Sequence, residues 1–275
     1  MNIKFILASF ILAFFLFSCG EKPVAKKESM AQFSDDKEFQ NAHERPEKIN
    51  HDGKGEMITF EVAGEEPGNA YQIKSANGST AKTLLVIHEW WGLNDHIKEE
   101  ADRLYEELGD FHVMALDLYD GRVATEPKQA GEFMKSIKPE RAKAIIQGAI
   151  AHLGSDAKIA TVGWCFGGGW SLRSGILAGE QGVASIIYYG MPVESAEEIA
   201  PLKADVMMIH PTKDKWINQG VVDNFKTLSK ATGKSLVVHQ FEADHAFANP
   251  SRPNYIEEDA NKANQLTLDF IKKRM

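Results

Sequence analysis

From residue 56 onward, short apolar runs alternate with amphipathic segments, and this alternation constrains the fold more than any other feature of the chain. Residues 83–88 (TLLVIH) form a continuous apolar run, which is typical of a strand buried on both faces of a sheet. Residues 94–108 then place apolar side chains at helical spacing, with Gly109 as a candidate C-cap. Alternation of this length predicts an α/β fold with a mostly parallel central sheet and helices on both faces.

A single domain over residues 56–275 accounts for the whole pattern. The other expected strands cover residues 57–62, 70–74, 112–116, 158–163, 183–189, 205–210 and 235–241. The other expected helices cover residues 126–153 with a break at Pro139, 166–178, 219–231 and 254–273. A parallel sheet carries its chemistry at the carboxyl ends of its strands, so functional residues are expected there.

The start of the chain indicates export. Residues 5–17 are apolar apart from Ser9, a run shorter than the ~20 residues that a bilayer span needs, so residues 1–18 are interpreted as a signal peptide. The ending Leu16-Phe17-Ser18-Cys19 resembles a bacterial lipobox, which implies cleavage before Cys19 and a lipid on that cysteine. The expectation is an exported lipoprotein anchored to a membrane of the cell envelope. A plain signal peptide that happens to contain a cysteine is the alternative.

Residues 19–55 are rich in Lys, Glu, Asp, Gln, Asn and Ser, which predicts a flexible, solvated tether between anchor and domain. The net charge of −8 comes without a cluster of Lys and Arg, so a nucleic-acid partner is not expected. We expect a monomer.

The sharpest motif is Gly163-Trp164-Cys165-Phe166-Gly167, which follows an expected strand and opens an expected helix. A nucleophile flanked at ±2 by glycine is the nucleophile-elbow pattern of α/β-hydrolases, with cysteine in place of serine. The partial positive charge of a helix N-terminus favours a thiolate at this place. A buried structural cysteine in a glycine-rich turn is the alternative.

An acid and a histidine follow in the chain order that this fold requires. Asp214 comes just after the strand expected at 205–210, and His245 just after the one at 235–241. Cys165, Asp214 and His245 therefore make a candidate nucleophile–acid–base triad. Asp205 or Asp244 could be the acid instead, or Asp214 and His245 could be ordinary loop residues.

A fourth strand end carries His88-Glu89-Trp90-Trp91-Gly92-Leu93-Asn94. In an α/β-hydrolase this loop supplies one oxyanion-hole amide, and the residue after the nucleophile, Phe166, supplies the other. Glu89 is a carboxylate that the triad does not need, and it could instead be a capping or exposed side chain.

Together these segments, with Asp117-Leu118-Tyr119 and Asp244-His245-Ala246-Phe247-Ala248, resemble the dienelactone hydrolase family (carboxymethylenebutenolidase-like enzymes). The resemblance implies that Cys165 is the nucleophile, His245 the base and Asp214 its orienting acid. It further implies that Glu89 contacts the nucleophile and poises its proton, and that the amides of Trp90 and Phe166 form the oxyanion hole.

The resemblance also bears on substrate recognition. Arg122 matches, after a one-residue insertion, an arginine that grips the substrate carboxylate in the family, a task that suits a guanidinium. The best-known members carry a second such arginine four residues after the base, where this chain has Asn249, with Arg252 close by. This departure places the dienelactone substrate in doubt, though not hydrolysis.

The resulting hypothesis is hydrolysis of an activated ester or lactone, a small molecule, through an acyl-thioester on Cys165. The sequence shows no metal-ligand spacing of the HExxH or paired-cysteine type, so neither a metal nor a cofactor is expected. Two alternatives remain: a membrane-anchored ligand-binding lipoprotein with a vestigial hydrolase fold, and a redox role for Cys165.

Overall fold

The computed structural model describes residues 29–275 and contains an eight-stranded sheet with the order β1-β2-β4-β3-β5-β6-β7-β8. The strands are β1 (Glu56–Phe60), β2 (Gly68–Ile73), β3 (Lys82–Ile87), β4 (His112–Asp117), β5 (Lys158–Trp164), β6 (Gly182–Tyr188), β7 (Asp205–Pro211) and β8 (Leu236–Phe241). β1 and β2 pair antiparallel at one edge, and β4 to β8 are parallel to β3. The predicted α/β-hydrolase fold, with its mostly parallel sheet, is confirmed.

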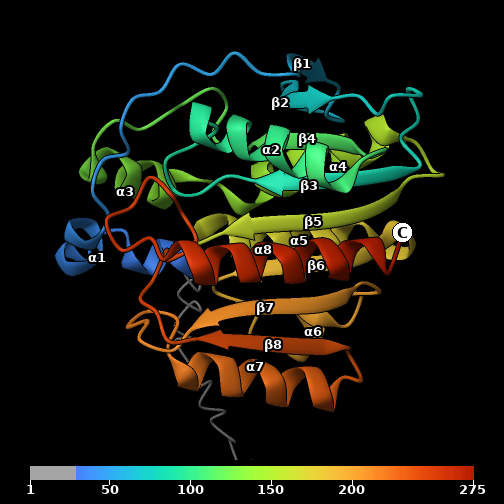
Figure 1. Ribbon diagram of the computed structural model, residues 1–275. Coiled ribbons are helices and arrows are strands. Elements are labelled where there is room, and N and C mark those ends of the chain that lie inside the picture. The colour runs from blue at the N-terminus through green and yellow to red at the C-terminus, as the bar shows by residue number, and fades with distance from the viewer. Residues whose placement is uncertain (1–28) are drawn as a thin grey trace, which may run out of the picture.

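Helices cover both faces of this sheet. They are α1 (Lys37–Ala42), α2 (Asp95–Leu108), α3 (Pro127–Ser136), α4 (Pro139–Leu153), α5 (Phe166–Leu177), α6 (Ala196–Ile199), α7 (Gln219–Ala231) and α8 (Glu257–Lys272), with short 3-10 turns η1 (Ser29–Phe33) and η2 (Gly179–Gln181). α2 and α8 contact each other on one face, and α4 and α5 contact each other on the other (Figure 1). Among residues 29–275, no helix is both long and apolar enough to cross a membrane.

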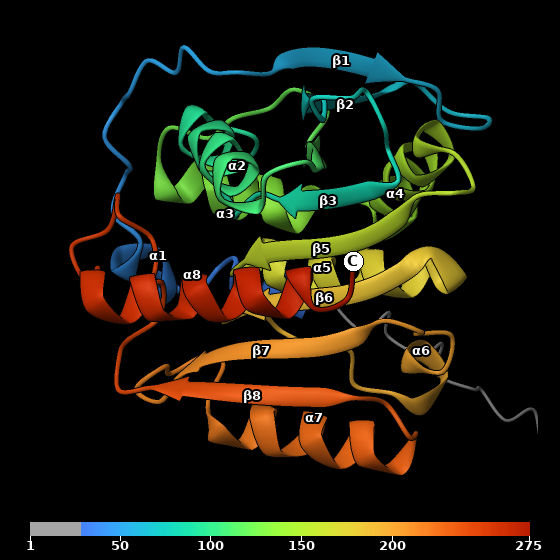
Figure 2. The ribbon, with the colours of Figure 1, turned by 45° about the vertical axis from the view of Figure 1, so that its right-hand side comes forward.

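The central strands are buried because helices lie on both sides of them. Every residue of β4 is buried, as is every residue of β3 after Lys82. The parallel strands all point the same way in Figure 2, so the carboxyl ends of β3, β5, β7 and β8 lie along one edge. The loops that leave this edge carry the residues singled out by the sequence.

Part of the expected tether is folded against the domain. Residues 29–45, called here the N-terminal cap, include η1 and α1, and α1 lies beside the carboxyl ends of the strands (Figure 1). Asp36 caps α1 by accepting hydrogen bonds from two backbone amides, and Met30 and Phe39 are fully buried. The expectation of a solvated tether is therefore wrong for this stretch, because its few apolar side chains bury against the domain. The signal peptide, Cys19 and the rest of the tether up to residue 28 lie outside the described residues.

Candidate active site

Cys165 occupies a strained turn between β5 and α5. Its φ of 55° lies in the left-handed region, which a residue other than glycine adopts only when its surroundings enforce it. A Cβ at Gly163 would overlap the carbonyl oxygen of Gly167, and one at Gly167 would overlap the carbonyl oxygen of Ile87. The two flanking glycines are thus required by close backbone approach, as the elbow pattern predicts.

His245 and Asp214 are paired beside this cysteine. Nδ1 of His245 donates to Oδ2 of Asp214 at 2.6 Å, which leaves Nε2 to face the rest of the site. Oδ1 of Asp214 accepts hydrogen bonds from the amides of Trp216 and Ile217, at 2.9 and 3.0 Å, so the carboxylate is fixed in place. The Cys165 sulfur lies within 4.8 Å of a ring nitrogen of His245. All three side chains are buried.

Burial and charge act in opposite directions on these groups. Burial lowers the pKa of His245, but the negative charges of Asp214 and of the Cys165 sulfur raise it to about 10. Burial raises the pKa of Asp214, but the charge and hydrogen bond of His245 and the two amides outweigh burial and lower it. Burial also raises the pKa of the Cys165 thiol, against the opposing charge of His245. A proton that leaves the sulfur is therefore held firmly on the imidazole.

Glu89 lies in the same buried region but bonds to a different partner from the one expected. Its Oε2 accepts a hydrogen bond from Nδ2 of Asn249 at 2.7 Å. Burial raises the pKa of Glu89, opposed by the charges of Arg252 and His245 and by the Asn249 bond. When ionised, Glu89 raises the pKa of Cys165. Glu89 was expected to contact Cys165 directly. It instead acts on Cys165 through its charge, and its hydrogen bond is to Asn249.

Of the two residues expected to form the oxyanion hole, Phe166 directly follows Cys165. Phe166 is the first residue of α5, and its backbone N–H faces the Cys165 sulfur and lowers the pKa of the thiol. Trp90 follows β3 and is fully buried. Next to it, Nε2 of His88 accepts a hydrogen bond from the amide of Leu118, and the His88 ring stacks on Phe166. This hydrogen bond joins the loop after β3 to the loop after β4.

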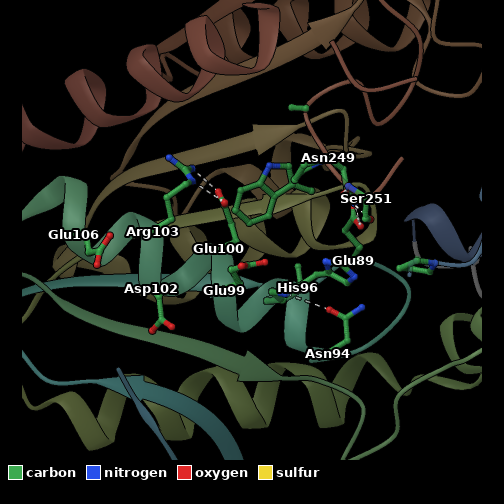
Figure 3. A pocket seen from close by; sticks show the side chains of 15 residues that line it. Glu89, Asn94, His96, Glu99, Glu100, Asp102, Arg103, Glu106, Asn249 and Ser251 are labelled. Atoms are coloured by element: carbon green, nitrogen blue, oxygen red, sulfur yellow. Dashed lines mark hydrogen bonds and ion pairs between the residues drawn. The ribbon is translucent and has the colours of Figure 1, made fainter. Parts of the chain in front are cut away.

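Two hollows reach residues of this site. One, of about 390 Å³, is lined by Glu89, Trp164 and Asn249 and extends along α2. Figure 3 shows Glu89 and Asn249 at one end of it, with Arg103 and Glu106 of α2 towards the other. The second hollow, of about 320 Å³, is lined on the cap side by His43 and on the domain side by Trp216 and His245.

A strained cysteine, a histidine–carboxylate pair and a helix N-terminus at one sheet edge are the parts of a nucleophilic hydrolase. The family model for the dienelactone hydrolase family matches residues 69–275. The chain belongs to the dienelactone hydrolase family. The chain is a carboxylic ester hydrolase.

Individual proteins agree with the family match. The chain is 29% identical over 233 residues to "Protein usf" of Aquifex pyrophilus, covering 80% of this chain and 98% of that one. It is 26% identical over 208 residues to carboxymethylenebutenolidase 1 of Cupriavidus pinatubonensis, covering 70% and 86%. A solved dienelactone hydrolase-like promiscuous phosphotriesterase from metagenomic libraries has the same fold, with a TM-score of 0.69, 19% identity and coverage of 81% and 99%.

Arg122, which the family resemblance assigned to the substrate carboxylate, is not brought to this dienelactone hydrolase-like site. Its guanidinium donates to the carbonyl of Tyr119 and to Oγ of Ser136, and it stacks on Phe133 at 4.7 Å. It lines a separate hollow on the outer side of the loop after β4. The side chain of Tyr119, which senses the charges of both Arg122 and Cys165, lies in between.

Two residues at this site, His43 and Arg252, carry contacts that no sequence motif predicts. The ring of His43 packs against Trp90 and His245, with centroids 4.9 and 5.2 Å away. Arg252 is buried and donates to the backbone carbonyls of Ala42 and Glu44, on either side of His43. A helix start at Asp36 followed by Phe39 was the available signal, but it lay in the stretch set aside as tether.

Proposed function

We propose that Cys165, His245 and Asp214 act as a catalytic triad that hydrolyses activated esters or lactones of small molecules through an acyl-thioester. The observation that carries the proposal is the 2.6 Å bond between His245 and Asp214 next to a strained cysteine at a helix N-terminus. In such an arrangement the acid fixes the tautomer and orientation of the imidazole, and the imidazole serves the nucleophile.

In the acylation step His245 takes the proton of the Cys165 thiol, and the sulfur attacks the carbonyl carbon of the substrate. The carbonyl oxygen becomes an oxyanion held by the backbone amides of Trp90 and Phe166. The carbon–oxygen bond of the ester then breaks, and the imidazolium returns its proton to the leaving alkoxide or enolate. In deacylation His245 activates water, which releases the acid and restores the thiol.

Cysteine as nucleophile narrows the substrate class. A thiolate is a good leaving group, so the tetrahedral intermediate reverts unless the substrate carries an equally good one. Enol lactones, aryl esters and thioesters meet this condition better than alkyl esters or amides. Recognition of a substrate carboxylate is less well supported, because Asn249 replaces an arginine and Arg122 lies elsewhere.

The test compares hydrolysis of an enol lactone that bears a carboxylate, a neutral enol lactone and an aryl ester by the full chain. Cys165→Ala is expected to abolish turnover of all three, and Cys165→Ser separates loss of the sulfur from loss of the side chain. Rapid quenching and mass spectrometry are expected to find the acyl group on the peptide that contains Cys165. Turnover that survives Cys165→Ala would reject the nucleophile assignment.

We also propose that the chain is exported and lipidated at Cys19. The support is the order of a short apolar run, Ser18 and a cysteine, followed by a polar stretch. Partition between detergent and water phases tests it: the wild-type chain made in a bacterial host is expected in the detergent phase, and Cys19→Ala in the aqueous phase. Equal partition of both would contradict a lipid anchor at this residue.

A further inference from the structure

His43 is a buried histidine that the triad does not use. Its Nδ1 donates to the backbone carbonyl of Phe39 at 2.6 Å, so Nε2 of the neutral ring is a free acceptor. Within the described part of the chain, Nε2 of His43 is buried without a hydrogen-bond partner, while the side chain of His245 interacts with the Cys165 sulfur. Burial, followed by the charge of His245, lowers the pKa of His43 well below its ordinary value. A buried polar atom without a partner calls for an explanation.

The backbone around His43 is held in place from several sides. Arg252 fixes the carbonyls before and after it, at Ala42 and Glu44. Phe39 packs edge-on against Trp90 and Trp216, with centroids 5.1 and 5.0 Å away. The indole Nε1 of Trp216 donates to Asp36, the residue that caps α1. These contacts therefore fix the backbone and ring of His43 next to Cys165.

Three potential metal ligands converge at this point. The Cys165 sulfur and ring nitrogens of His43 and His245 all lie within 4.8 Å of one another, and all three residues are buried. Each imidazole is also held at its far nitrogen, His43 by a carbonyl and His245 by the Asp214 carboxylate. Metal-binding histidines almost always show this second contact, which fixes the tautomer and raises the basicity of the ligating nitrogen.

We infer that Cys165, His43 and His245 bind a thiophilic divalent cation of the Zn²⁺ class, and that binding reversibly blocks the nucleophile. Three protein ligands with a fourth position open to water form a common zinc arrangement. A thiolate with two imidazoles suits Zn²⁺ or Co²⁺, whereas Mg²⁺ and Ca²⁺ prefer oxygen ligands. The step balances: the Cys165 thiol and the His245 imidazolium each lose a proton to solvent, and one sulfur–metal and two nitrogen–metal bonds form.

Distance, charge and access are compatible with such a site. Ligation at ~2.0–2.3 Å brings the ligand atoms to within roughly 3.3–3.8 Å of one another, so a contraction of about 1 Å by side-chain rotation suffices. The negative charges of the thiolate, the Asp214 carboxylate and Glu89 would balance the positive charge of the metal ion. The charge of Arg252 would repel the ion, but its guanidinium is hydrogen-bonded to the two cap carbonyls. The hollow lined by His43, Trp216 and His245 reaches two of the three ligand residues.

The test titrates the metal-stripped full chain with Co²⁺, in a reductant that does not bind metals. The expected result is one equivalent bound, with a sulfur-to-cobalt charge-transfer band that disappears in Cys165→Ser and is displaced by Zn²⁺. His43→Gln is expected to weaken binding by more than the roughly 10–100-fold that loss of an outer contact costs. His239→Gln, on β8, is the matched control and should bind as the wild type does.

X-ray absorption at the zinc edge gives an independent count, with one sulfur and two imidazoles expected in the wild type. This measurement needs no variant, so it decides the question even if His43→Gln fails to fold. No Co²⁺ band, a sulfur-free spectrum, or equal affinity of wild type and a folded His43→Gln would each overturn the inference.

The blocking effect rests on the proposed function, and the binding does not. Zn²⁺ is expected to inhibit ester hydrolysis by the wild type, and a chelator should restore the activity. If His43→Gln retains turnover, a much higher Zn²⁺ concentration should be needed to inhibit it. If the stripped enzyme hydrolyses none of the test esters, the proposed function fails while the Co²⁺ spectrum still reports on the site. If it hydrolyses them and Zn²⁺ has no effect, the metal inference fails alone.

Discussion

Replacing Phe39 with alanine is expected to expose Cys165. Phe39 is fully buried, and its ring contacts those of His43, Trp90, Trp216 and His245. Removing a buried phenylalanine costs about 3–5 kcal/mol. Because the cap is a short terminal segment with few other buried side chains, we expect this loss to appear as local detachment of the cap rather than as global unfolding.

Cys165 is only 1% exposed, so it cannot react with a thiol reagent until the site opens. The expected change in its labelling rate therefore depends on how often the cap detaches. When opening is a rapid pre-equilibrium, the labelling rate scales with the population of the open state. A loss of about 3–5 kcal/mol then raises that rate by about 100- to 4,000-fold, since each 1.4 kcal/mol is tenfold.

The assay follows iodoacetamide labelling of the Cys165 peptide by mass spectrometry, which separates it from Cys19. The matched control is Phe225→Ala, a buried phenylalanine on α7 that contacts neither the cap nor the triad residues in any ring pair. Its global stability should fall while labelling stays near the wild-type rate. If Phe39→Ala labels no faster than the wild type, the reagent reaches Cys165 by another route, and the cap does not control access.

Three further outcomes are expected. Asp214→Asn, which keeps the shape but loses the charge that orients His245, should lower kcat/KM by roughly 10³–10⁴-fold in a steady-state ester assay; a loss below tenfold would contradict its role as the triad acid. The folded pKa of His245 is about 10 against 6.5 when unfolded, so the native state binds more protons between these values and stability falls as pH rises through that window. His245→Gln should therefore flatten the pH dependence of Tm between pH 7 and 9, and an unchanged slope would assign it to other groups. Gly163→Ala should lower Tm markedly because the new methyl group overlaps the backbone of Gly167, unlike Gly220→Ala as control.

The strand ends were predictable because they follow from local rules. The apolar runs at residues 83–88 and 158–163 became β3 and β5 with small shifts of boundary, since a strand buried on both faces has few other places to go. Close backbone approach explains the glycines around Cys165. Chain order then identified Asp214 and His245, which the structure brings together.

Contacts between segments distant in sequence were not predictable in the same way. Composition marks residues 29–45 as polar, and composition cannot show that one ring, Phe39, finds three aromatic neighbours more than fifty residues away. The expected position of Arg122 at the substrate carboxylate was not found for a related reason. Its place depends on how the loop after β4 turns, and that loop directs the guanidinium towards Phe133 instead of the nucleophile.

Asn249 and the cap both occupy the region beside Glu89 and Arg252. An arginine at position 249 would place a charged side chain beside Glu89; asparagine satisfies that carboxylate with a single neutral hydrogen bond of 2.7 Å. The nearby cation is Arg252, which donates hydrogen bonds to the backbone carbonyls of Ala42 and Glu44. These bonds fix the backbone on either side of His43. Both terminal nitrogens of Arg252 are thereby engaged with the cap, and among the described residues its Nε has no hydrogen-bond partner. If the proposed function holds, we expect selection to rest on the reactivity of the carbonyl and on the opening of the cap, more than on a charge carried by the substrate.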